Sequence, residues 1–232
     1  SKFDDGIVCA SAGNHAQGVA FACKTLGVDG TIFMPATTPQ QKVQQVKMFG
    51  GTFVQIILTG DTFDDSLAAA KAFCQGKNIA FIHPFDDPKI IEGQATVGLE
   101  ILEDWEGKID YLLLPIGGGG LAAGVSAIFK QLSPATLIIG VEPMGAPSML
   151  RAIEKKAVTT LAQIDKFIDG ASVKAVGNYT FDICKNTLSE VLLIPEGLVC
   201  KTMLQLYNEE AMVVEPAGAL SIAALELLKN RI

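Results

Sequence analysis

The chain has 232 residues, of which 49% are hydrophobic and 19% are charged, so it can bury the core of one large domain or two small ones. Its net charge of -7 argues against a nucleic-acid-binding surface, and no apolar run approaches the roughly 20 residues that a membrane helix needs. No signal-peptide pattern is present. The cysteines are scattered and odd in number, which indicates a reducing, cytoplasmic setting (Cys9, Cys23, Cys74, Cys184 and Cys200).

Strands and helices alternate in the first part of the chain, which predicts a parallel sheet covered by helices. Strands are expected over residues 6–10, 30–34, 52–58 and 79–82. Helices are expected after the polar turn at 11–18, from Thr38 as N-cap to Gly50, and from Asp61 as N-cap to about Gly76. Two prolines frame an acidic turn at 83–88, so we expect a small α/β domain over residues 1–85 and a large one over residues 86–232.

The same alternation continues beyond this boundary. Strands are expected over residues 111–115, 137–142 and 191–194. Helices are expected over about 89–105, 121–132, 196–209 and 217–229. Residues 144–190 are predicted to be the least regular part, because Pro147, Gly170 and Gly177 interrupt them.

The turn over residues 11–18, with the sequence SAGNHAQG, lies between the first strand and the first helix. Backbone N–H groups at a helix start have no partner within the helix and bind anions well. Asn14 adds a side chain that both donates and accepts hydrogen bonds. The turn therefore suits an anionic ligand, although an ordinary capped connection explains an isolated SxGN equally well.

Four consecutive glycines, Gly117, Gly118, Gly119 and Gly120, separate an apolar strand from a helix rich in small residues. Glycine allows the backbone to approach a ligand closely, and the following helix directs its N–H groups and dipole toward it, so a phosphate is the expected guest. Gly118, Gly120 and Ala123 also satisfy the dinucleotide pattern GxGxxG/A, with Glu142 where a ribose-binding acid would stand. These residues alone leave both ligands open.

Together, the two loops and several further motifs resemble the threonine dehydratases, which are fold-type II pyridoxal-phosphate enzymes. The matching segments, in order, are residues 11–18, 34–42, 84–87, 116–123, 140–143, 169–173 and 215–219. The resemblance covers essentially the whole chain and favours pyridoxal phosphate over a dinucleotide. It implies an α/β fold of two open, mostly parallel twisted sheets covered by helices, like tryptophan synthase β, incomplete at both termini. It also implies a homo-oligomer, either a dimer or a tetramer.

In this family the cofactor aldehyde condenses with the substrate amine, and its ring stabilises the carbanion left by removal of the Cα proton. Loss of the β-hydroxyl and hydrolysis turn L-threonine into 2-oxobutanoate and ammonia, or L-serine into pyruvate, in isoleucine biosynthesis or threonine catabolism. By position, the resemblance implies that Asn14 bonds the cofactor's ring hydroxyl and that Gly117 to Gly120 receive its phosphate. It assigns the substrate carboxylate to the turn of Ser11, Ala12, Gly13 and His15, mostly through backbone N–H groups.

Three further positions follow from the resemblance. Gly170 and Glu215 match residues that line the cofactor pocket, although Glu215 before Pro216 is also a plain helix-start signal. Serine racemases, which are close relatives, carry a catalytic serine where this chain has Ala12. A methyl group cannot move a proton, so Ala12 favours elimination over racemisation.

A divalent-cation site found in some relatives is not expected here. Glu142 and Ala146 match two of its positions, but the third, an Asp in those relatives, is Ser148. A neutral hydroxyl is a poorer ligand for a hard cation, and two histidines without a Cys/His cluster argue against zinc. Glu142 is then expected to be a charged residue at a strand end.

No catalytic residue is identified in this chain, because the family's Schiff-base lysine is expected upstream of Ser1. Lys2 has the wrong separation from the loop at 11–18 and is expected to be a solvated surface residue. The chain also ends before the strand and Ser-Gly-rich turn that meet the pyridine nitrogen in relatives, and before any regulatory domain. We therefore expect little dehydratase activity from this chain alone. Two alternatives stay open: a non-catalytic module that binds a phosphate ligand, and an NAD-dependent oxidoreductase built on Gly118 and Glu142.

Overall fold

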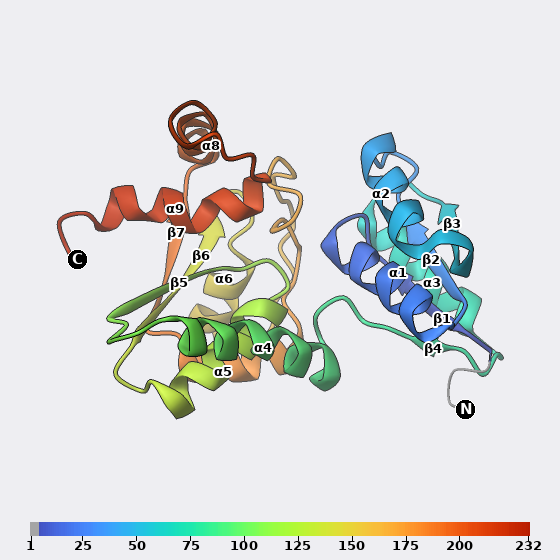
Figure 1. Ribbon diagram of the computed structural model, residues 1–232, viewed down its shortest axis with the longest axis horizontal. Helices are drawn as coiled ribbons and strands as arrows, with labels where there is room; N and C mark the ends of the chain where they lie inside the picture. Colours follow the sequence, from blue (N-terminus) through green and yellow to red (C-terminus); the bar gives the residue numbers. More distant parts are fainter. Residues whose placement is uncertain (1–4) are drawn as a thin grey trace. The chain divides into compact units, whose positions relative to one another are not determined.

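The computed structural model describes residues 5–232. Contacts divide the chain into two compact units, Ser1–Pro84 and Phe85–Ile232, the first of which is described from Asp5 onward. Each unit has its own parallel sheet with helices packed on it (Figure 1). The predicted α/β class with parallel, helix-covered sheets is therefore confirmed.

The first unit contains a four-stranded parallel sheet in the order β3-β2-β1-β4. Its strands are β1 (Ile7–Ala10), β2 (Gly30–Met34), β3 (Val54–Leu58) and β4 (Ala80–Phe81). The helices between them are α1 (Asn14–Leu26), α2 (Gln40–Gly50) and α3 (Phe63–Cys74), with a short 3-10 turn, η1 (Gly51–Phe53).

Side chains alternate across this sheet, as the two-residue period of a strand requires. On one face, Cys9 and Ile32 pack with residues of α1 and α2. On the other face, Val8 and Phe33 pack with Ala70 of α3. Both faces are therefore buried, which explains why the strands are nearly continuous apolar runs in the sequence.

The second unit contains a three-stranded parallel sheet in the order β5-β6-β7. Its strands are β5 (Tyr111–Pro115), β6 (Leu137–Pro143) and β7 (Glu190–Ile194). Its helices are α4 (Pro88–Asp104), α5 (Gly120–Leu132), α6 (Ser148–Lys155), α7 (Asn178–Thr187), α8 (Glu196–Glu210) and α9 (Pro216–Leu228).

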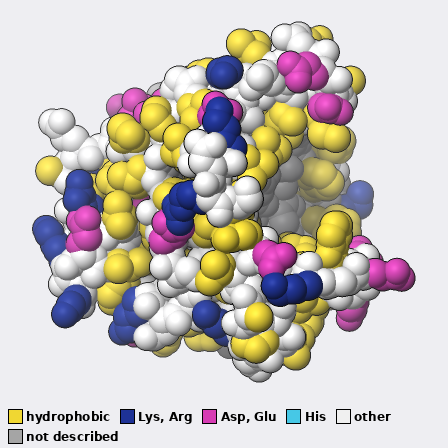
Figure 2. Space-filling model, turned by 90° about the vertical axis from the view of Figure 1, so that its left-hand side faces the viewer, with side chains coloured by type: hydrophobic (Ala, Val, Ile, Leu, Met, Phe, Trp, Pro, Cys, Tyr) yellow, Lys and Arg dark blue, Asp and Glu magenta, His cyan; other side chains and the backbone are white. Residues whose placement is uncertain are grey.

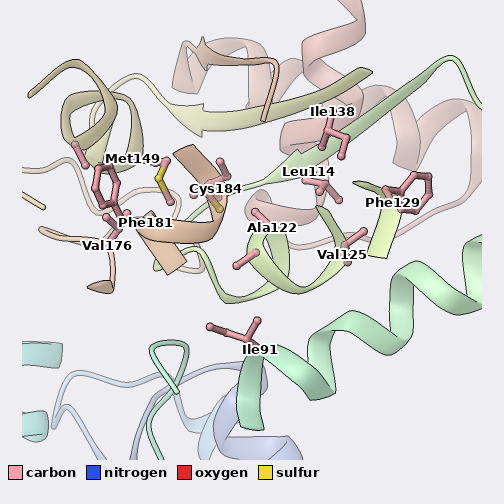
Figure 3. Close-up of a cluster of buried hydrophobic side chains, with 13 residues drawn as sticks. Ile91, Leu114, Ala122, Val125, Phe129, Ile138, Met149, Val176, Phe181 and Cys184 are labelled. Atoms are coloured by element: carbon pink, nitrogen blue, oxygen red, sulfur yellow. The ribbon is translucent and has the colours of Figure 1, made fainter. Parts of the chain in front are cut away.

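Two hydrophobic clusters lie on opposite faces of the second sheet. Leu114 and Ile138 belong to the cluster that α4, α5, α6 and α7 cover, in which Phe129 and Phe181 are the large aromatic members (Figure 3). Val141 belongs to the other cluster, which α8 and α9 cover. The helices thus hold the carboxyl ends of β5 and β6 in place, and the glycine run at 117–120 and Glu142 lie at these ends.

The structure corrects three sequence-based expectations. Helix α2 has Pro39 rather than Thr38 as its N-cap, and the buried Thr38 hydroxyl has no hydrogen-bond partner within residues 5–232. Helix α3 is capped by Thr62 rather than Asp61, because Thr62 and Asp65 form a reciprocal capping box. The region predicted to be least regular contains two helices, α6 and α7.

The five cysteines, all within the described residues, are free thiols. Burial raises the pKa of Cys9 and of Cys184 to about 12, so both behave as small hydrophobic side chains. None of the helices found between residues 5 and 232 combines the length and apolarity that crossing a membrane requires.

Candidate active site

The turn after β1 leaves the start of α1 open. The Ser11 N–H donates to the Phe33 carbonyl at 3.0 Å, and the Ser11 hydroxyl accepts from the Gly13 N–H at 3.2 Å. Gly13 is the N-cap of α1 and has no side chain with which to cap it. Asn14, the first residue of the helix, is exposed. The first turn of α1 therefore presents N–H groups and an amide side chain suited to an anionic or polar ligand.

This turn lies at the topological switch point of the first sheet. The chain proceeds outward from β1 to β2 and β3, then returns to place β4 on the other side of β1. In open α/β sheets, ligands bind outside the carboxyl ends of the strands at such a point. His15, at the start of α1, connects this turn with the end of β4, since its Nε2 lies 3.3 Å from the carbonyl oxygen of Ile82, just after β4.

His15 is electrically neutral at neutral pH. Burial, together with a smaller effect of the nearby His83, lowers its pKa to about 4, and the hydrogen bond to Ile82 opposes this shift. Because a carbonyl only accepts, Nε2 carries the proton. The side chain thus adds no positive charge, and an anion at this turn would depend on backbone N–H groups.

The glycine run forms the turn between β5 and α5. Gly119 has φ +94, a left-handed conformation that favours glycine, and it is the N-cap of α5 without any capping side chain. A Cβ at Gly118 would lie 2.2 Å from Cδ1 of Phe85, and one at Gly120 would lie 3.1 Å from Phe85 Cβ. The N–H groups at the start of α5 are therefore suited to a phosphate, and close packing of Phe85 also requires glycine here.

The second unit brings three of the predicted site residues together. A Cβ at Gly117 would lie 3.1 Å from the carbonyl oxygen of Gly170. A Cβ at Gly170 would in turn lie 2.9 Å from Ala217 Cβ and 3.8 Å from Glu215 Oε1. Glu215 is exposed and is the N-cap of α9. The glycine run, Gly170 and Glu215 thus form one neighbourhood at the carboxyl end of β5.

Glu142 does not face a ligand. Its side chain is fully buried, and its carboxylate accepts from the N–H groups of Met149 at 2.7 Å and Leu150 at 2.9 Å and from the Ser148 hydroxyl at 3.3 Å. Burial raises its pKa to about 7, against the opposing effect of these hydrogen bonds. Glu142 therefore lies at the end of β6, as expected, but its buried carboxylate caps α6.

The same geometry argues against the dinucleotide interpretation of Glu142. A carboxylate occupied on both oxygens is not available to a ribose, which removes the acid that the dinucleotide interpretation assigned to Glu142. At the positions that match the relatives' cation site, the Ala146 carbonyl accepts from the Ser148 N–H at 2.9 Å, and the Ser148 hydroxyl donates to Glu142. Within residues 5–232, no group of three His, Cys, Asp or Glu side chains is arranged to hold a metal ion.

Sequence reasoning missed the residues that hold the glycine run in place. Phe85 packs against Gly118 and Gly120, and the Thr180 hydroxyl donates to the Gly118 carbonyl at 2.7 Å. Phe85 belongs to a motif already noted at 84–87, so a local signal existed for it. Thr180 had no such signal, because its helix was not predicted. The expectation for Lys2 lies outside the described residues.

The family is identified by comparison with known proteins. The family described as "Pyridoxal-phosphate dependent enzyme" matches residues 3–232. The chain therefore belongs to the pyridoxal-phosphate-dependent enzymes, and the predicted cofactor class is confirmed at the level of the family.

The curated relatives are named threonine dehydratases, and two of the similar solved structures are threonine deaminases. The chain is 54% identical over 231 residues to "L-threonine dehydratase biosynthetic IlvA" of Halalkalibacterium halodurans, and it covers 56% of that protein. Its fold is similar to threonine deaminase isoform 2 of Solanum lycopersicum, with TM-score 0.89, 40% identity, and 96% and 64% of the two chains covered. A second threonine deaminase, from T.th., is likewise similar, with TM-score 0.90, 35% identity, and 98% and 73% covered. The chain thus spans little more than half of the curated relative.

Proposed function

We propose that this chain is the central part of the catalytic domain of a pyridoxal-phosphate-dependent threonine ammonia-lyase. The enzyme converts L-threonine into 2-oxobutanoate and ammonia, and L-serine into pyruvate. It acts in the cytoplasm, in isoleucine biosynthesis or threonine catabolism. The 54% identity to a threonine dehydratase over 231 residues carries the proposal.

The described residues fit the phosphate end of the cofactor. The run Gly117–Gly120 ends at a helix start whose N-cap has no side chain, which suits a phosphate group. Gly170 lies beside Gly117, Glu215 lies beside Gly170, and both would line the same pocket. When bound, pyridoxal phosphate supplies an aldehyde and an electron-withdrawing ring that stabilises a carbanion at Cα of the substrate. In this proposal, a lysine outside the described residues would provide the covalent attachment.

The first unit supplies the groups that orient the ring and the substrate. Asn14 is exposed at the first position of α1, and its amide would bond the ring hydroxyl of the cofactor. The turn from Ser11 to His15 binds the substrate carboxylate through N–H groups at the helix start, because the His15 side chain is neutral. Ala12 has no proton to deliver to the second face of the substrate, so the site eliminates rather than racemises.

A homo-oligomeric assembly forms part of the proposal. Several large hydrophobic side chains of α8 and α9 are exposed: Leu204, Tyr207, Ile222, Leu225 and Leu227. Figure 2 shows hydrophobic side chains in several groups between the charged ones on one face. The exposed apolar side chains of α8 and α9 would be available to a further copy of the chain.

Borohydride reduction of the full-length holoenzyme, followed by peptide mass spectrometry, tests the assignment. We expect one pyridoxyl group on a lysine outside residues 5–232, together with 2-oxobutanoate formation from L-threonine. A pyridoxyl group on a lysine within those residues would show that the site is wrongly assigned. Absence of both the adduct and the product would refute the function.

A further inference from the structure

The carbonyl group of Gly118 is held on the protein side of the glycine run. The Thr180 hydroxyl donates to it at 2.7 Å, and the Gly177 N–H approaches it at 3.4 Å. The same hydroxyl accepts from the Gly177 N–H at 3.0 Å. Its single proton has a second acceptor, the Gly177 carbonyl at 3.2 Å, but the Gly118 carbonyl is the closer one. Thr180 is fully buried, so water does not compete for these bonds.

Anchoring this carbonyl determines where the next N–H group points. The described chain contains no cis peptide bonds, and in a trans peptide the C=O of one residue and the N–H of the next point in opposite directions. With the Gly118 oxygen held at Thr180, the Gly119 N–H is directed away from Thr180. A free Gly118–Gly119 peptide would be able to rotate and place the negative end of its dipole where a phosphate binds.

Thr180 is itself fixed by a carboxylate from the start of the second unit. The Asp86 side chain accepts from the N–H groups of Asn178 at 2.9 Å, Tyr179 at 2.8 Å and Thr180 at 3.3 Å. These are the first N–H groups of α7, so Asp86 caps that helix and complements its dipole. A Cβ at Gly177 would lie 2.2 Å from Asp86 Cγ, so the close approach requires glycine there.

Phe85 covers another side of the same turn. A Cβ at Gly118 would lie between 2.2 and 2.5 Å from three atoms of the Phe85 ring. The ring therefore packs directly on the glycine backbone and restricts its movement. The turn is thus held by Phe85 on one side and by Thr180 on its carbonyl.

We propose that Phe85, Asp86 and Thr180, which we call the loop brace, are positioning residues that set the phosphate affinity of the glycine run by fixing the Gly118–Gly119 peptide. The inference deepens the proposed function and rests on it. The loop brace acts through its contacts with the glycine run and with the start of α7. Its effect is specific to the phosphate, because it acts through N–H groups that only an anion requires.

The test compares pyridoxal 5′-phosphate with pyridoxal, the same ring without the phosphate, in the full-length protein. Thr180→Val keeps the shape of the side chain and removes the donor, whereas Thr180→Ser keeps the donor and is the matched control. We expect Thr180→Val to reduce the preference for the phosphorylated form about tenfold, and Thr180→Ser to change it less than about threefold. Binding is measured by the cofactor absorbance, and folding by circular dichroism.

The outcomes separate this inference from the proposed function. If Thr180→Val weakens both ligands equally, or neither, the loop brace has no positioning role. If Thr180→Val does not fold, Asp86→Asn replaces it, with an expected loss of preference of about threefold, and an unchanged preference overturns the inference. If the wild-type protein binds neither ligand, the proposed function itself is wrong, and this inference falls with it.

Discussion

Glu142 offers a quantitative test of the buried cap of α6. Its pKa is raised from 4.5 to about 7, so the folded state holds the proton more tightly than the unfolded state does. The stabilisation from this proton is complete below about pH 4.5, declines as the pH rises, and is lost above about pH 7. Between pH 5 and pH 8 the linkage amounts to about 2.5 kcal/mol of unfolding free energy.

Glu142→Gln removes this titration and retains the side-chain shape. We expect the free energy of unfolding of the wild-type chain to fall by about 2.5 kcal/mol more than that of the variant between pH 5 and pH 8. Urea denaturation followed by circular dichroism measures both, and taking the difference cancels the other titrating groups. The exposed Glu103 provides a matched control, since Glu103→Gln removes one negative charge without touching a helix cap. Equal losses in the wild type and Glu142→Gln would refute the reasoning.

Three further predictions concern the glycine run, a cap and a histidine. Gly118→Ala places a Cβ against the Phe85 ring, so we expect it to lower the free energy of unfolding by about 1–3 kcal/mol and to weaken cofactor binding. Gly93→Ala, which lies in open space on α4, is the control and should raise the free energy of unfolding by about 0.5–1 kcal/mol in the same urea assay. Thr62→Ala breaks the capping box of α3, and we expect the unfolding free energy to fall by about 1 kcal/mol. Because the pKa of His15 is lowered, the stability that this residue contributes above pH 6.5 is lost as the pH falls toward 4. Between pH 7 and pH 4.5, the unfolding free energy of His15→Gln should therefore fall by about 2 kcal/mol less than that of the wild type, as measured by urea denaturation at both pH values.

Local sequence patterns predicted most of the fold, because most helix ends here are capped by residues that are close to the helix in the sequence. Gly27 and Gly51, for example, end α1 and α2 at positive φ, and Asp87 caps α4 two residues before the N–H that it accepts. The errors at α2 and α3 were displacements of a single residue in the N-cap. At α3 the correct N-cap was predictable, since Thr62-x-x-Asp65 is a capping-box pattern.

The helices α6 and α7 were missed for a different physical reason. Their first N–H groups are satisfied by carboxylates outside the helices: Glu142 on β6 serves α6, and Asp86 serves α7 from about 92 residues earlier in the chain. A helix capped in this way carries no start signal of its own, so only the folded chain shows it. The position of Thr180 beside the glycine run depends on α7, so it was not predictable from the sequence either.

The failure to predict α6 explains why the sequence did not decide which ligand the glycine run binds. Glycines at 118 and 120 satisfy a dinucleotide pattern and a phosphate loop alike, and the packing of Phe85 requires them in either case. The residue that discriminates is Glu142, since a ribose-binding acid has to be accessible. Its burial follows from α6, whose N–H groups occupy both of its oxygens. Whether an acid at the end of a strand serves a ligand or a helix is thus decided by an element that the sequence pattern did not show.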